Sequence, residues 1–285
     1  MAPSSSPTVR RRRLAAELRR LRLASKLTIE QVAETLEWSP GKVSKIENAR
    51  VSVLPRDARK LLDTYGISEG AERDLLLSLA RESRARGWWQ QYGETVPEWF
   101  ATYVGLEAEA TAISTYQSEI VPGLLQTQRY AEALHRAALM NATNDEIGRH
   151  VAVRMERQDR LRQHDAPQLW VVLSEAVIRR VVGNRDTMRE QLLRLAEAAS
   201  APNITLQVLP FTAGAHASMD SAFSILSFDP ADGEIVYFEH PTCSLYLERP
   251  DEVSRYRLVY EHLRAASLPL DETQRLIARS AEDLA

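Results

Sequence analysis

The sequence has 285 residues, of which 44% are hydrophobic and 26% are charged, as is typical of a chain that folds into globular domains. It lacks a run of about 18 apolar residues, and no apolar stretch follows its basic N-terminal cluster, so we expect neither a membrane span nor a secretion signal. Its single cysteine, Cys243, excludes an intrachain disulfide and a cysteine-rich zinc site. We therefore expect a cytoplasmic protein.

Charge is distributed unevenly along the chain. Residues 1–60 contain 14 Lys and Arg against 6 Asp and Glu, a net charge of +8, and the remainder contains 22 against 33, a net charge of −11. A basic end on an acidic body is typical of a nucleic-acid-binding head, because neutralising phosphates releases counterions and supplies non-specific affinity. The sequence thus favours DNA binding at the N-terminal end.

The first 25 residues predict a polar leader followed by a helix. Residues 1–9 are small, polar and proline-bearing, so we expect them to be disordered. Leu14, Leu18 and Leu21 then recur at helical spacing and predict a helix over residues 10–25. The four arginines Arg10 to Arg13 have three interpretations: an arm along DNA, a first helical turn that contacts phosphates, or a solvated charge run.

Two short helices separated by a turn are predicted between Thr28 and Asn48. The first has one apolar face, with Thr28 as N-cap and Gln31 completing a capping box. Ser39 and Pro40 then form an N-cap and a first helical position, where the missing N–H of proline costs nothing. The second helix buries only Val43 and Ile46.

The side chains that the second helix leaves outward are small, hydroxyl-bearing or cationic. They belong to Gly41, Lys42, Ser44 and Lys45. Such side chains fit the major groove, because they can contact base edges and phosphates without steric conflict.

This segment resembles the helix-turn-helix of the XRE or lambda-repressor-like family, and it ends in a version of the SxIENG signature of that family. Glu37 departs from the pattern, since it stands where the turn usually has glycine, and Ile29 stands where glutamine is common. The resemblance implies a DNA interface in which Lys42, Ser44 and Lys45 contact bases and Gly41 lets the backbone approach. Its further expected DNA-binding residues are Arg10, Arg11, Arg12, Arg13, Thr28, Ser39, Asn48 and Arg50.

Two more predicted helices, opening at Pro55 and near Ser68, complete an all-α head of five helices over residues 10–84. The SRARG stretch, residues 83–87, is the candidate domain boundary. Six aromatic residues between Trp88 and Tyr103 then predict either a ligand pocket or a core nucleus that docks the head onto the rest.

For residues 87–285 the prediction is an α+β domain with a small, mostly antiparallel sheet. The predicted strands are QLWVVL at 168–173, ITLQVLP, AFSILSF, EIVYFEH and CSLYLE, with turn residues Asp229-Pro230 and Asp232-Gly233 placing the third and fourth in a hairpin. The segment PGLLQT at 122–127, followed by a helix with Tyr130, resembles the large C-terminal domain of unknown function in actinomycete-type XRE regulators.

The candidate ligand-binding or partner-binding residues of this domain are Pro122, Gly123, Gln126, His216, Tyr237 and Glu239, on turns and strand ends. The alternative is that Gly123 only permits a turn and that His216 is a surface histidine. Ser174, Glu175, Glu239, His216 and His240 could suit a hydrolase, but no nucleophile elbow, metal-ligand pair or phosphate loop accompanies them. We expect no catalytic residue, metal or cofactor.

The sequence therefore predicts a transcriptional regulator that binds specific double-stranded DNA as a homodimer, with a C-terminal domain that binds a ligand or partner. An alternative, implied by the resemblance, is an antitoxin-like module that sequesters a small protein encoded nearby and regulates its own operon. An enzyme tethered to DNA is the third hypothesis.

Overall fold

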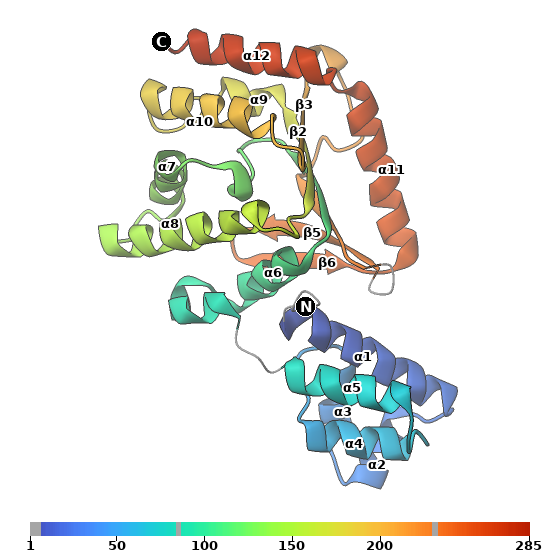
Figure 1. Ribbon diagram of the computed structural model, residues 1–285. Helices are drawn as coiled ribbons and strands as arrows, with labels where there is room; N and C mark the ends of the chain where they lie inside the picture. Colours follow the sequence, from blue (N-terminus) through green and yellow to red (C-terminus); the bar gives the residue numbers. More distant parts are fainter. Residues whose placement is uncertain (1–6, 84–86, 230–232) are drawn as a thin grey trace. The chain divides into compact units, whose positions relative to one another are not determined.

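The computed structural model describes residues 7–83, 87–229 and 233–285. The chain divides into two compact units, Met1–Gln90 and Gln91–Ala285, which we call the head and the body. Figure 1 shows the helical head in blue and cyan and the sheet-containing body in green to red. Residues 84–86 of the predicted domain boundary lie outside the described residues.

The described part of the head forms the five predicted helices. They are α1 (Pro7–Ala24), α2 (Ile29–Leu36), α3 (Pro40–Glu47), α4 (Pro55–Thr64) and α5 (Ala71–Glu82). Their shared core contains Leu14 and Leu18 of α1, Val32 of α2 and Leu61 of α4, each at most 1% exposed. These positions recur at helical spacing in the sequence, which explains why the head was predictable.

The first helix begins earlier than predicted. It includes Pro7, Thr8 and Val9, which the sequence places in a disordered leader. Proline suits this position, because its missing N–H is unsatisfied in the first helical turn in any case. The rest of the predicted leader, residues 1–6, lies outside the described residues.

The body is built on a six-stranded mixed sheet in the order β3-β2-β1-β4-β5-β6. The strands are β1 (Ala112–Gln117), β2 (Gln168–Ser174), β3 (Ile204–Leu209), β4 (Phe223–Ser227), β5 (Glu234–His240) and β6 (Cys243–Leu247). Strand β2 pairs in parallel with both β1 and β3, whereas β1–β4, β4–β5 and β5–β6 are antiparallel.

The expectation of a mostly antiparallel sheet is therefore wrong, and the predicted β4–β5 pairing is confirmed. The parallel half arises because helices separate β1 from β2 and β2 from β3, and parallel neighbours need such long crossovers. The continuous apolar run Leu169 to Leu173 carries this signal, since a strand buried on both faces lacks alternation. Residues 230–232 of the predicted hairpin turn lie outside the described residues.

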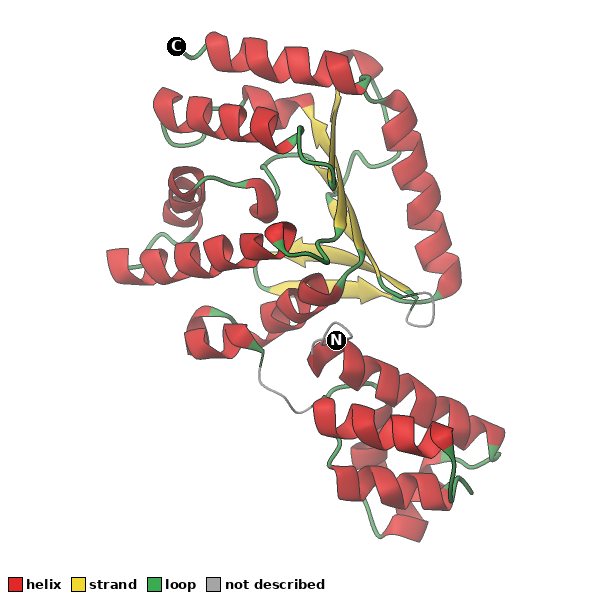
Figure 2. Cartoon of the chain, in the orientation of Figure 1, coloured by secondary structure: helices red, strands yellow, loops and turns green. Residues whose placement is uncertain are grey.

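Helices cover both faces of the sheet (Figures 1 and 2). On one face lies α11 (Pro250–Ala266), whose Val253, Tyr260 and Leu263 join the apolar cluster over β1, β4 and β5. The other face carries the crossover helices α7 (Gln128–Ala138), α8 (Asn144–Gln158), α9 (Glu175–Arg179) and α10 (Arg185–Ala198).

The remaining helical segments of the chain are η1 (Trp88–Thr95), α6 (Glu98–Glu109), η2 (Gly123–Leu125), η3 (Asp159–Arg162), η4 (Phe211–Ala213) and α12 (Leu270–Glu282). Within the described residues, no helix has both the length and the apolar content that crossing a bilayer requires.

Candidate DNA-binding site

The helix-turn-helix begins with the predicted capping box. The backbone N–H of Gln31 donates to Thr28 Oγ1 at 3.2 Å, and the backbone N–H of Thr28 donates to Gln31 Oε1 at 2.8 Å. Two of the N–H groups left open at the start of α2 are thereby satisfied. Thr28, a predicted DNA contact, remains exposed while it performs this structural role.

The turn between α2 and α3 depends on a left-handed residue. Glu37 has φ 56° and ψ 41°, and the backbone N–H of Trp38 donates to Ala33 at 2.8 Å, which closes α2. Glycine adopts this conformation without steric cost, so the usual glycine of the turn is replaced here by a strained glutamate. Glu37 in place of glycine therefore makes the turn less favourable in energy, but the left-handed backbone conformation of the turn still forms.

The predicted cap of α3 is also present. The backbone N–H of Lys42 donates to Ser39 Oγ at 3.2 Å, and Pro40 occupies the first helical position. Behind the helix, Val43 and Ile46 are 0% and 2% exposed in the head core. The two aliphatic residues therefore anchor α3 from the inner side, as predicted.

An ion pair reinforces this anchor. Arg22 of α1 donates from Nε and Nη2 to the two carboxylate oxygens of Glu47, at 2.7 and 2.8 Å, and from Nη1 to the carbonyl of Leu27 at 2.8 Å. Arg22 and Glu47 are 7% and 8% exposed. A buried two-point contact of this kind fixes orientation as well as distance, so it ties the last residue of α3 to α1.

The outward face of α3 consists of Gly41, Ser44 and Lys45. Gly41 and Lys45 are exposed, and Ser44 is partly buried. A Cβ placed on Gly41 would meet no atom within 4 Å, so the fold itself does not require glycine there. The small residue is thus available for a close approach by another molecule.

Lys42 lies differently from Lys45. Its Nζ is 2.9 Å from Asp57 Oδ2 on α4 and 3.5 Å from the centroid of the Trp38 ring. The ammonium therefore sits between a carboxylate and an aromatic face, both outside α3.

The C-terminal end of α3 is a second left-handed turn. Asn48 donates from Nδ2 to the carbonyl of Ser44 at 2.8 Å, and Ala49 has φ 54°. The backbone N–H of Arg50 then donates to Lys45 at 2.9 Å. Asn48 and Arg50 are both exposed beside this end of the helix.

The arginine block forms part of α1, in agreement with the helical interpretation and not with an extended arm. Arg10 pairs with Glu82 at the end of α5, at 3.1 Å. Arg10 precedes Arg22, the partner of α3, by twelve residues, about 18 Å along the helix. Arg10 therefore lies far along α1 from Arg22, which contacts Glu47 at the C-terminal end of α3.

Sequence reasoning missed Arg22 and Asp57 and assigned no role to Glu47. A signal for Arg22 exists, since it lies one helical turn after Leu18 and beside Leu21 on the buried face of α1. A charge within an apolar stripe requires a buried partner. The partner of Lys42 carried no comparable signal, because Asp57 is an ordinary acidic residue in the first turn of α4.

In the body, the PGLLQT turn is held by internal hydrogen bonds. Gln126 is 1% exposed, donates to the carbonyl of Val121 at 2.6 Å and accepts from Arg154 at 2.7 Å. Gln158 donates to the carbonyls of Gly123 and Gln126 at 2.9 and 2.8 Å. A Cβ on Gly123 would lie 3.4 Å from the Arg157 guanidinium, an ordinary contact, so packing alone does not require glycine there. Pro122 and Gly123 remain partly buried.

The other predicted ligand-binding residues of the body are His216, Tyr237 and Glu239. They lie toward the edge of the sheet where β1, β2, β3 and β5 end, because these four strands run in one direction. Tyr237 donates to Glu239 Oε2 at 2.9 Å. His216 Nε2 lies 3.2 Å from the Tyr116 hydroxyl, and its Nδ1 accepts from the backbone N–H of Ser218 at 3.2 Å. Burial lowers the pKa of His216.

Glu175 and Glu239 lie on strands that are not neighbours in the sheet. Glu175 directly follows β2 and Glu239 is next to the last residue of β5, and the two strands are three positions, roughly 14 Å, apart. Glu175 also accepts from the backbone N–H of Phe211 at 2.9 Å and pairs with Arg179 at 3.1 Å.

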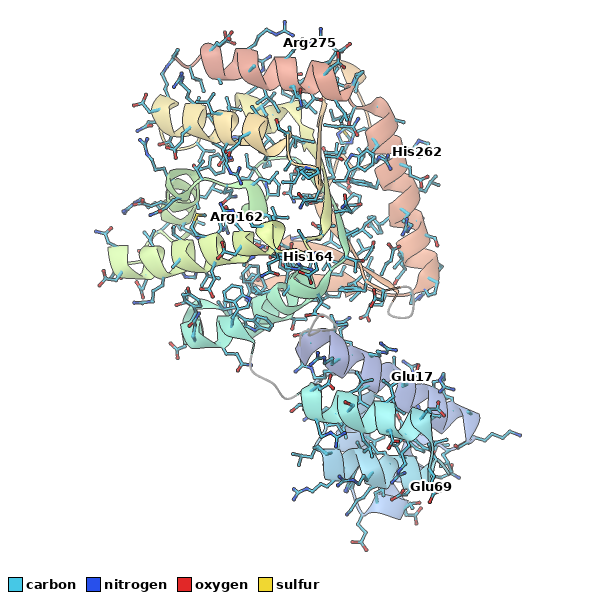
Figure 3. All side chains as sticks on the ribbon, in the orientation of Figure 1. Glu17, Glu69, Arg162, His164, His262 and Arg275 are labelled. Atoms are coloured by element: carbon cyan, nitrogen blue, oxygen red, sulfur yellow. The ribbon has the colours of Figure 1, made fainter. Side chains whose placement is uncertain are left out.

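A surface cleft of about 680 Å³ lies along α12, where Figure 3 labels Arg275. It is lined by Leu268, Glu272, Arg275, Leu276, Ala278 and Arg279. None of the predicted ligand-binding residues lines this cleft.

Two family models match the chain. One, described as a helix-turn-helix domain, matches residues 13–76, and the other, described as a domain of unknown function (DUF5753), matches residues 100–279. The second match spans 180 of the 285 residues. These matches confirm the predicted order of a helix-turn-helix followed by a large domain of unknown function. No curated protein and no solved structure matches the chain.

Proposed function

The chain belongs to the DUF5753 family and carries a helix-turn-helix domain ahead of it, and from this we propose a sequence-specific, XRE-like transcriptional regulator that binds double-stranded DNA. The observation that carries the proposal is the division of α3 into two faces. Val43 and Ile46 are buried in the head, while Gly41 and Lys45 are exposed. Short and cationic side chains on such a helix suit the major groove.

The residues of the helix-turn-helix divide by role. Lys42, Ser44 and Lys45 contact base edges, and the absent side chain of Gly41 lets the helix backbone approach the groove. Thr28, Ser39, Asn48, Arg50 and the α1 arginines 11–13 contact phosphates, which position the head without specifying sequence. Arg10, which was also predicted to do so, pairs with Glu82 instead. Thr28 and Ser39 support this assignment, because each marks a helix N-terminus, where backbone N–H groups and the helix dipole favour an anion.

A homodimer is the form in which we expect the regulator to bind. One helix-turn-helix head buries too little surface for tight specific binding, so two heads contact two half-sites about 34 Å apart or a multiple of that distance.

The body binds a ligand or partner in this proposal. Its support is a set of exposed apolar side chains on loops that follow the parallel strands: Ile120, Val181, Phe211 and Met219, which are 37%, 45%, 61% and 68% exposed. An ion pair between Glu119 and Arg180 joins two of these loops at 2.5 Å. Exposed apolar side chains grouped in this way are typical of interaction surfaces.

The antitoxin-like alternative uses the same surface, with a small protein as its partner. A small basic protein encoded beside the gene, bound in a stable complex with the body, would favour this alternative. Binding of a small molecule that changes operator affinity would favour a ligand sensor.

Sequencing the genomic fragments that the purified full-length chain retains tests the proposal. We expect a shared motif with two related half-sites, and Lys45→Ala should retain it less well than the wild-type chain. Fragments without a shared motif would contradict sequence-specific binding.

A further inference from the structure

The two lysines of α3 have different electrostatic surroundings. Lys45 is exposed and has no ion-pair partner among the described residues. Lys42 lies 2.9 Å from the Asp57 carboxylate and 3.5 Å from the centre of the Trp38 ring. One of the two cations is therefore balanced within the head and the other is not.

The groups that surround Lys42 belong to the scaffold and not to α3. Asp57 lies in the first turn of α4, its side chain is 14% exposed, and its backbone N–H donates to Leu54 at 2.8 Å. Trp38 precedes the cap of α3 and packs partly buried against the head core. Asp57 also has Arg56 Nε at 3.9 Å, a longer contact than that of Lys42. The acceptor and the ring thus have defined positions before any partner arrives.

This arrangement changes what Lys42 can contribute to DNA binding. Non-specific affinity and its salt dependence follow from the number of phosphates that protein cations neutralise. A lysine whose charge is already balanced by a fixed carboxylate adds little to that number. Its ammonium still has three N–H donors, of which Asp57 accepts one, so the others remain available to an acceptor on a base edge.

We infer that Asp57 and Trp38 are specificity-determining positioning residues, which hold Lys42 so that it discriminates between bases instead of neutralising phosphate. The inference rests on the proposed DNA-binding function. Lys45, which contacts a base edge in the proposed function, then also supplies the salt-dependent contribution of α3, whereas Lys42 contributes discrimination between bases alone.

The test compares Asp57→Asn with Asp63→Asn in the full-length chain. Asp63 is on the same helix, is 61% exposed and pairs with Arg73 at 2.8 Å, so its variant removes the same charge without touching Lys42. Dissociation constants are measured over a salt series for two duplexes: an operator recovered from retained genomic fragments and a scrambled duplex of equal length and composition.

For Asp57→Asn we expect the released lysine to raise affinity for the scrambled duplex several-fold. The salt slope should steepen by about one, and the ratio of operator to scrambled affinity should fall about tenfold. Asp63→Asn should keep the wild-type ratio and slope. The inference would be overturned if the two variants had the same affinity ratio and salt slope. It would also be overturned if Asp57→Asn lost affinity equally for both duplexes at an unchanged salt slope.

Lys42→Met gives an independent test should Asp57→Asn not fold. We expect about tenfold weaker operator binding, with scrambled-duplex affinity and salt slope unchanged. A slope reduced by about one would show that Lys42 neutralises phosphate and would overturn the inference. Failure of the wild-type chain to bind either duplex would instead contradict the proposed function, and the inference with it.

Discussion

Arg22 and Glu47 form a two-point ion pair inside the head, with N–O distances of 2.7 and 2.8 Å and with both residues less than one-tenth exposed. The pair joins α1 to the last residue of α3. The side-chain hydrogen bond to Glu47 raises the pKa of Arg22 against the opposing effect of burial. The helix that presents Lys45 outward therefore has a polar anchor in addition to Val43 and Ile46.

Glu47→Ala should destabilise the head strongly. Removing one member of a buried ion pair leaves the other charge without a partner, which costs about 3–5 kcal/mol. The change in the unfolding free energy of the head is measured by urea unfolding of the full-length chain, monitored with a spectroscopic signal that comes from the head. Glu17→Ala removes one of two exposed partners of Arg20, 2.8 Å away, while Glu72 remains, and should cost less than about 1 kcal/mol. Equal losses for the two variants would mean that the buried pair does not stabilise the head.

Glu37→Gly should stabilise the head. The left-handed conformation at φ 56° is strained for glutamate and free for glycine, so we expect a gain of about 0.5–1 kcal/mol. Glu34→Gly, at an exposed interior position of α2, is the control and should lose about 1 kcal/mol. Chemical denaturation distinguishes the two, and a loss of stability in Glu37→Gly would show that the turn is not strained by its side chain.

Gly41→Ala separates folding from DNA binding. A methyl group at Gly41 meets no atom of the fold within 4 Å, so stability should stay constant or rise by up to about 1 kcal/mol. Operator affinity should fall about tenfold if the backbone of α3 approaches the DNA. Gly148 of α8 also has open space around it and provides the matched control, Gly148→Ala. Unchanged operator affinity in Gly41→Ala would place the DNA elsewhere.

The stability of the body should fall as the pH falls below about 6.5. Burial, reinforced by Arg154 and His150, lowers the pKa of His135 to about 3, and its Nε2 has no hydrogen-bond partner among the described residues. Between the unfolded value near 6.5 and the folded value, the unfolded chain binds a proton that the folded chain does not, so folding becomes less favourable.

Unfolding free energies at pH 7.5 and pH 5 measure this effect. The wild-type chain should lose about 1–2 kcal/mol more than His135→Asn over that interval. His164→Asn, at the exposed histidine labelled in Figure 3, should behave as the wild type does. Equal pH dependence in all three proteins would contradict the neutral state of the half-buried His135.

The helix-turn-helix was predictable because its signals are local. Thr28 with Gln31, and Ser39 with Pro40, fix the starts of both helices, and the spacing of Val43 and Ile46 fixes which face is buried. The contacts that orient α3 join residues far apart in the chain, Arg22 to Glu47 and Lys42 to Asp57. No local pattern identifies such partners.

In the body, too, the sequence did not reveal which distant segments pair, and this affected the strand order of the sheet. Its strands had clear apolar signatures, and the continuous apolar run of β2 indicates a strand covered on both faces, but that run does not identify β1 and β3 as its parallel neighbours. The hydrogen bond between Gln126 and Arg154 was only partly visible, because Arg154 follows Ile147 and Val151 on the inner face of α8 but nothing local identifies Gln126 as its partner. Sequence reasoning chose Gln126 from the resemblance of its segment and not from its partners.

The most direct test of the central claim, that the outward face of α3 binds DNA, is the operator affinity of Lys45→Ala across a salt series. Arg162→Ala, which removes one exposed cation from the body, is the matched control. We expect Lys45→Ala to weaken operator binding by about 1–3 kcal/mol and to reduce the salt slope by about one, with Arg162→Ala unchanged. Wild-type affinity and slope in Lys45→Ala would contradict the account.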